Sequence, residues 1–159
     1  MTKPPIWFRR RFYPHLDKPV SLNNATEVVT DPKKVSQHAF MPFISFEVVE
    51  KRYKPDLNKV EPKKRPLSCC AHMDAAIFSY YSMILSEKYE KKISEYGLSE
   101  SVLAYRKFPG GKCNIHFAND TFNLIAQRGN SAAVAFDVKG FFDSLDHQAL
   151  KKIGLTYWD

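Results

Sequence analysis

A chain of 159 residues can bury one ordinary hydrophobic core, and its composition, 44% hydrophobic and 26% charged, is that of a globular protein. The longest wholly apolar run, Ala132 to Phe136, is too short to cross a bilayer, and residues 1–11 lack the apolar segment of a secretory signal. Three cysteines, an odd number, give no disulfide framework. These features favour a cytoplasmic protein without a membrane partner.

The net charge of +7 is distributed unevenly along the chain. Residues 1–66 hold 14 Lys and Arg against 7 Asp and Glu, whereas residues 67–159 hold 10 of each sign. Lys and Arg that neutralise phosphates release counterions and gain affinity, so this asymmetry indicates a polyanionic partner. A solvated surface that only keeps the protein in solution explains the same charge, and composition leaves both interpretations open.

The first part of the chain predicts a basic arm followed by β structure. Residues 1–39 mix arginines with aromatic residues and turn formers, which predicts an extended arm. Residues 40–53 are rich in Phe, Val and Ile, as a strand should be. Residues 51–66 combine lysines with three prolines, which predicts a mobile basic hairpin, and residues 67–71 are expected to return as a second short strand.

Two helices are expected next. From His72 to Tyr96, apolar residues recur at steps of three and four, and Gly97 is a natural stop for this helix. The glycine loop at residues 109–111 separates it from a second helix, expected over residues 115–127.

The last part of the chain predicts a strand and a helix. Residues 132–137 are small and apolar and end in an acid, which predicts a buried strand that delivers Asp137 to its end. Ser144 is expected to cap a last helix from Leu145 onward.

An aspartate at a strand end has a rigid base and an exposed carboxylate, which suits a metal ligand. Phe142, five residues after Asp137, is expected to lie close to the same site. The alternative is an ordinary capping aspartate after a core strand, because acids at strand ends are common. Spacing alone leaves both interpretations open.

The segment Phe136 to His147 resembles the first palm motif of reverse transcriptases, particularly those of the group II intron, retron and defence-associated bacterial branches. Two upstream segments resemble motifs of the same family in the right order. Lys63 to Leu67 resembles its basic finger strand, and Asp74 matches the acid of the helix that follows. Residues 104–116 resemble the second finger motif, so that the resemblance covers about residues 40–155.

This resemblance implies an α+β fold, that of a right-hand polymerase. Residues 1–39 are then a basic amino-terminal arm, residues 40–130 the fingers subdomain, and residues 131–159 the start of a truncated palm. Only the first strand and helix of the palm lie in this sequence, so the expected strand should have unpaired edges and an exposed apolar surface.

The resemblance also implies site residues. In the intact enzyme the catalytic Asp137 would bind two Mg²⁺ ions together with a second pair of aspartates, and the backbone carbonyl of Val138 would complete one metal shell. Phe142 matches the aromatic position that excludes a 2′-hydroxyl and so selects dNTPs.

Basic residues of the same motifs are expected to contact phosphates. Arg65, with Lys64 or Lys59 nearby, would hold the triphosphate, and Arg106 and Lys112 would face the template strand. The implied partners are an RNA template, a DNA or RNA primer and dNTPs, and a protein partner from a defence system is left open.

The chain departs from the family in one respect. The palm needs a Tyr/Phe-x-Asp-Asp hairpin, and these 159 residues contain no Asp-Asp dipeptide. One carboxylate cannot hold two divalent ions, so this chain alone is not expected to act as an RNA-directed DNA polymerase. The alternative function is a non-catalytic nucleic-acid-binding module. A phosphohydrolase is disfavoured, because Lys139 stands where that class wants another aspartate.

A zinc site is possible only if two distant segments of the chain come together, and it is disfavoured. Its candidate ligands lack the usual Cys-x-x-Cys spacing, and buried cysteines with a hydrogen-bonded histidine are the simpler interpretation. These candidates are Cys69, Cys70, His72, Cys113 and His116.

Overall fold

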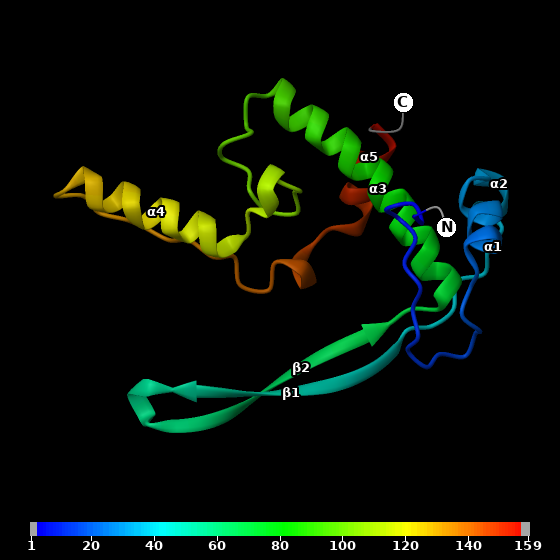
Figure 1. The fold of residues 1–159 in the computed structure, drawn as a ribbon, viewed down its shortest axis with the longest axis horizontal. Coiled ribbons are helices and arrows are strands. Elements are labelled where there is room, and N and C mark those ends of the chain that lie inside the picture. Colours follow the sequence, from blue (N-terminus) through cyan, green and yellow to red (C-terminus); the bar gives the residue numbers. More distant parts are fainter. Residues whose placement is uncertain (1–2, 157–159) are drawn as a thin grey trace. The chain divides into compact units, whose positions relative to one another are not determined.

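The computed structural model describes residues 3–156, which fall into two compact units that divide between Glu87 and Lys88. Helices and a two-stranded antiparallel sheet are both present, which confirms the α+β class (Figure 1). The predicted boundaries after residues 39 and 130 stay predictions. The elements are α1 (Leu22–Val29), α2 (Pro32–Ser36), β1 (Ile44–Lys54), β2 (Lys59–Cys69), α3 (His72–Glu95), α4 (Asn114–Arg128) and α5 (His147–Thr156).

The predicted basic hairpin is confirmed, with a second strand that is longer than expected. Strands β1 and β2 pair continuously from Ile44 opposite Cys69 to Lys54 opposite Lys59. The connection is a single 3-10 turn that ends at Asn58, whose φ of 45° lies in the left-handed region that asparagine tolerates.

Two prolines of the segment predicted as a mobile hairpin, residues 51–66, lie inside the second strand. Pro62 pairs with Lys51 and Pro66 pairs with Glu47. Each strand of a two-stranded ribbon has an open edge, so proline is tolerated where its nitrogen faces away from the partner strand. The four-residue spacing gives both prolines the same orientation in the ladder.

The core of the first unit joins three segments. Trp7 from the amino-terminal arm packs with Ala25 and Val29 of α1 and with Ala76 and Ile77 of α3. The prediction that residues 1–39 form an extended arm is therefore wrong in its second half, where α1 and α2 form. Helices of eight and five residues are too short to show a clear period, and they depend on tertiary packing for stability.

The long helix α3 confirms the predicted helix and its end. Gly97 adopts a φ of 64°, and the amide of Leu98 donates to the carbonyl of Ile93 at 2.9 Å, which closes the last turn. No helix within residues 3–156 is long and apolar enough to cross a membrane.

In the second unit α4 is confirmed, whereas the predicted cap of the last helix is wrong. Helix α5 begins at His147, and Asp146 caps it by accepting the amides of Gln148 and Ala149 at 2.8 and 3.1 Å. Ser144 instead donates its hydroxyl to the carbonyl of Phe141 at 2.9 Å. A carboxylate one residue before the helix start reaches these amides directly, which explains the difference.

The predicted buried strand at residues 132–137 is also wrong. Residues 131–138 form neither a helix nor a strand, and Phe136 is 93% exposed. A strand needs a neighbour to satisfy its backbone hydrogen bonds, and the described part of the chain supplies none here. Val134, Phe136 and Val138 are exposed, so the segment has the expected apolar surface, but it belongs to no sheet.

Candidate nucleic-acid interface

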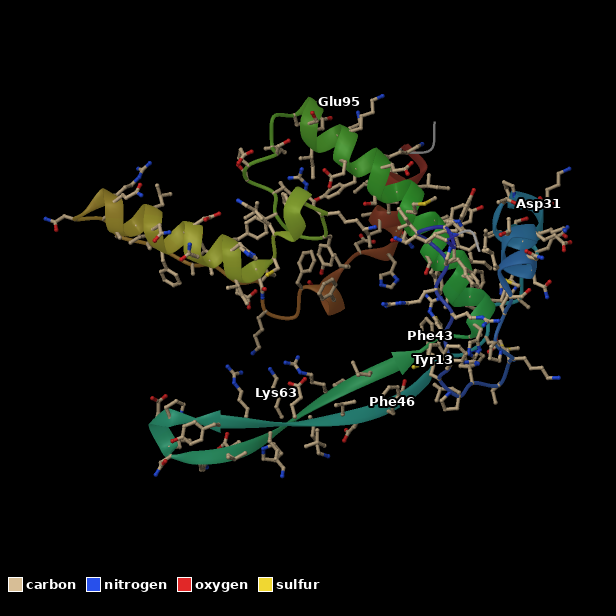
Figure 2. All side chains as sticks on the ribbon, in the orientation of Figure 1. Tyr13, Asp31, Phe43, Phe46, Lys63 and Glu95 are labelled. Carbon is tan, nitrogen blue, oxygen red and sulfur yellow. The ribbon has the colours of Figure 1, made fainter. Side chains whose placement is uncertain are left out.

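The β1–β2 hairpin carries a large group of basic residues. Residues 44–69 contain seven Lys and Arg against four Asp and Glu. Side chains alternate between the two faces of a strand, so these charges are divided between both faces of the ribbon. Figure 2 shows side chains projecting from the hairpin, Lys63 and Phe46 among them. The hairpin is therefore an exposed cationic surface.

The three residues expected to hold a triphosphate do not converge. Arg65 and Lys59 share one face, but six residues of strand separate them by roughly 20 Å, and Lys64 lies on the opposite face. Each is also engaged with a glutamate of the ribbon. The pairs are Arg65 Nε with Glu50 at 2.7 Å, Lys64 Nζ with Glu47 at 3.0 Å, and Lys59 Nζ with Glu61 at 2.8 Å.

Three other cations of the hairpin form no ion pair within the described residues: Lys51, Arg52 and Lys63. Arg52 and Lys63 are diagonal neighbours on one face, because Lys63 pairs with Glu50, two residues before Arg52, and Lys51 lies on the other face. Exposed ion pairs are weak, so the paired lysines can also exchange a glutamate for a phosphate at little cost. Unpaired cations need no such exchange and are the first candidates for phosphate contact.

Arg106 is bound within the second unit. Its Nε and Nη2 atoms donate to the carboxylate of Glu90 at 2.9–3.1 Å, and its Nη1 donates to two backbone carbonyls at 2.7 and 2.8 Å. Its side chain is only 9% exposed. The hydrogen bonds from Arg106 hold the pKa of Glu90 below its usual value. This arrangement favours a structural role over the predicted template contact.

Lys112 lies at the surface beside the start of α4. Its Nζ is 3.3 Å from Asp120, and both side chains are about half exposed. The ammonium also lies over the ring of Phe117. A pair this exposed contributes little to stability, so Lys112 remains available to an anionic ligand.

Asp137, Val138 and Phe142 are all exposed. The ring of Phe142 packs edge-on against Phe141, with centroids 5.3 Å apart. Among the described residues no three His, Cys, Asp or Glu side chains are grouped as a metal site requires. A single exposed carboxylate does not fit two Mg²⁺ ions, and the described residues do not form the metal centre that the resemblance implies.

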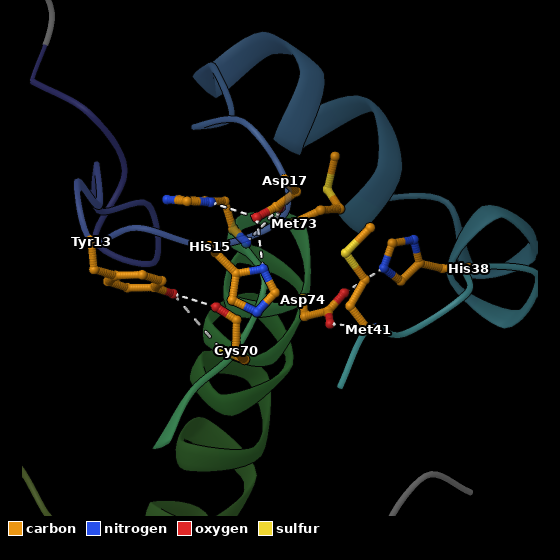
Figure 3. A network of polar contacts seen from close by, with 9 residues as sticks. Tyr13, His15, Asp17, His38, Met41, Cys70, Met73 and Asp74 are labelled. Atoms are coloured by element: carbon orange, nitrogen blue, oxygen red, sulfur yellow. Dashed lines mark hydrogen bonds and ion pairs between the residues drawn. The ribbon is translucent and has the colours of Figure 1, made fainter. Parts of the chain in front are cut away.

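Sequence patterns gave no sign of a polar network that joins the amino-terminal arm to α3 (Figure 3). Asp17 accepts the amide of His72 at 2.7 Å and that of Met73 at 3.4 Å, so the arm caps a helix 55 residues away. Asp17 also contacts the His72 ring at 2.7 Å. Burial raises the pKa of Asp17, but these hydrogen bonds outweigh it and the net shift is downward.

His15 lies in the interior beside Asp17. Its side chain is fully buried, and its Nδ1 lies 3.2 Å from Asp17 without the alignment of a hydrogen bond. Nearby, the hydroxyl of Tyr13 donates to the carbonyl of Cys70 at 2.7 Å. Burial, and next the neighbouring Cys70 thiol, raise the pKa of Tyr13 to about 12.

Asp74, the acid that matches the finger helix of the family, anchors a second connection. One carboxylate oxygen is 2.6 Å from Nε2 of His38, and the other accepts the amide of Met41 at 3.0 Å. Its side chain is 1% exposed. Asp74 therefore fixes the segment that leads into β1.

The cysteine and histidine residues considered for zinc lie in different units. Cys69 and Cys70 are half-buried at the end of β2, and Cys113 is exposed at the start of α4. Cys113 and His116 contact each other, with Sγ and Nδ1 3.3 Å apart.

No protein-family model and no curated protein sequence matches the chain.

Proposed function

We propose that this chain is the fingers and the first part of the palm of a reverse transcriptase, an RNA-directed DNA polymerase. The observation that carries the proposal is the resemblance of Phe136–His147 to the first palm motif, with two finger motifs upstream in the family's order. The exposed basic hairpin that bears Lys63–Leu67 is consistent with a finger element. In the intact enzyme Asp137 would be one of the catalytic aspartates.

The activity proposed for these 159 residues alone is binding of a primer–template. Exposed lysines and arginines of the hairpin contact phosphates and release counterions, which gives affinity without base specificity. Polymerisation needs carboxylates beyond Asp137, and the sequence has no Asp-Asp pair to provide them. The same observation favours the second candidate, a non-catalytic nucleic-acid-binding module.

The binding step is tested with a fluorescent RNA–DNA primer–template and anisotropy at several salt concentrations. Replacing Lys51, Arg52 and Lys63 by Gln should weaken binding by about tenfold or more and reduce the salt slope by about three. The matched control replaces Lys139, Lys151 and Lys152, which removes the same charge outside the hairpin. Equal losses in the two triple variants would show that only net charge matters.

The catalytic step is tested by the nucleotide sequence beyond the codon for Asp159. A Tyr/Phe-x-Asp-Asp hairpin encoded there supports the polymerase, and primer extension by the longer polypeptide should then be lost in Asp137→Asn. The control is Asp146→Asn, because asparagine caps α5 as well as aspartate does and extension should be retained. The absence of such a hairpin leaves the binding module as the function.

A further inference from the structure

The start of α4 combines a thiol, a base and a pocket. Cys113 is the N-cap of this 15-residue helix, and its backbone carbonyl accepts the amide of His116 at 3.0 Å. In return, Nδ1 of His116 accepts the amide of Cys113 at 3.1 Å. Because Nδ1 is an acceptor, it carries no proton in the neutral ring, and it faces the Cys113 sulfur at 3.3 Å.

This geometry suits an activated thiol. Nδ1 of His116 can take the Cys113 proton when its lone pair turns from the Cys113 amide to the sulfur, and the amino-terminal end of α4 favours negative charge on the sulfur. Cys113 is exposed, whereas Cys69 and Cys70 are half-buried at the end of β2. The chain therefore holds one thiol with an adjacent base and two thiols that serve as internal references.

An open pocket of about 520 Å³ lies beside Cys113. Its size is within the range of small-molecule sites. Apolar side chains and two cationic residues line it: Leu103, Phe108, Phe117, Arg106 and Lys112. Arg106 is occupied by Glu90, but the exposed pair of Lys112 with Asp120 is readily exchanged. The pocket suits a ligand that is partly apolar and carries a carboxylate.

We propose that Cys113 is a redox-modification site that reacts with a low-molecular-weight disulfide of the glutathione type. His116 takes the thiol proton, and the Cys113 sulfur attacks one sulfur of the disulfide. The S–S bond of the reagent breaks, a new S–S bond to Cys113 forms, and the leaving thiolate takes the proton from His116. Cys113 is oxidised to a mixed disulfide, and half of the reagent is reduced to a thiol.

The reaction is independent of the polymerase proposal, and glutathione disulfide at neutral pH tests it. Intact mass spectrometry and peptide mapping should show Cys113 modified at least about tenfold faster than Cys69 or Cys70. In urea the three cysteines should react at similar rates, because the base and the pocket are lost. Equal rates in the folded chain would overturn the proposal.

The variant His116→Gln separates the base from simple exposure. Glutamine at this helix position can still accept the Cys113 amide, so the cap is retained, but it cannot take the proton. The rate at Cys113 should fall about tenfold, while His147→Gln, at the exposed start of α5, should leave it unchanged. An unchanged rate in His116→Gln would show that exposure alone governs the reaction.

The pocket is tested by comparing two reagents. Lys112→Gln should slow the reaction with glutathione disulfide, which carries carboxylates, and leave that with uncharged 2-hydroxyethyl disulfide unchanged. Equal slowing with both reagents would contradict a role of the pocket in binding the disulfide.

Discussion

The two units of the chain use similar apolar residues with different results. In residues 3–87 the arm, α1 and α3 enclose a cluster that includes Trp7, Val29 and Ile77. Within the described side chains of residues 88–156, only Ile93 is buried, while Phe122 and Phe136 are exposed. The two units therefore differ in how far their apolar side chains are buried, and not in the kind of apolar residue they contain.

The difference lies in whether a second layer is present. A helix or an extended segment buries its apolar side only against another element. In the first unit the arm and α1 supply that layer for α3. Asp17 fastens the arm to the start of α3, and Asp74 fastens residues 38–41 to the same helix. In the second unit α4 and residues 131–138 leave most of their apolar side chains exposed.

The largest expected effect comes from truncating matched isoleucines in the two units. Ile77→Ala should lower the free energy of unfolding by about 3 kcal/mol, because it leaves a cavity in the core. Ile115→Ala should change it by less than about 0.5 kcal/mol, since nothing packs closely on that side chain. Ile77 is 3% exposed and Ile115 is 72% exposed. Urea unfolding followed by circular dichroism measures both.

Similar losses in the two variants would contradict the comparison. They would mean that Ile115 is buried in solution and that the second unit has a layer covering α4.

The sequence predicted those elements that depend on local pattern. The period of residues 72–96 and the stop at Gly97 gave α3 almost to the residue, and the Phe- and Val-rich run gave β1. The strand expected at residues 132–137 failed because β structure depends on a partner that local pattern does not reveal. The apolar run at residues 132–136 shows that the segment favours β structure, but not that a partner strand is present.

The candidate site was predictable only in part. The lysines and prolines of residues 51–66 located the basic hairpin, but the glutamates that engage Arg65 and Lys64 follow from the strand register. The contact of Asp17 with the start of α3 joins residues 55 apart. A single sequence carries no signal of such a pair, because each residue looks like an ordinary surface group.

The second effect in size concerns the acidic residues. Asp74→Ala should lower the free energy of unfolding by about 2 kcal/mol, because the amide of Met41 and the ring of His38 lose a buried acceptor. Asp120→Ala removes the same carboxylate from an exposed pair and should change the free energy by less than about 0.5 kcal/mol. Urea midpoints measure both. A small effect of Asp74→Ala would show that residues 38–41 are not fastened to α3 in solution.

The smallest expected effect tests a part-buried contact of the second unit, between Glu90 and Arg106. Because the pKa of Glu90 is lowered in the folded chain, its stabilisation is present above the ordinary carboxyl pKa and is lost as the pH falls through the lowered value. Hydrogen-exchange protection of Ser101 and Val102, corrected for intrinsic rates, should therefore fall on acidification. Glu90→Gln should show lower protection at neutral pH and little further change in acid.

The control for this contact is Glu95→Gln on the same helix. Its carboxylate makes only exposed contacts with lysines, so its removal should leave the protection of Ser101 and Val102 and its acid dependence unchanged. If the two variants behave alike, Arg106 is not held by Glu90 in solution. Its guanidinium is then available to the template strand, and the second unit lacks the contact that most resembles those of Asp17 and Asp74 among its described residues.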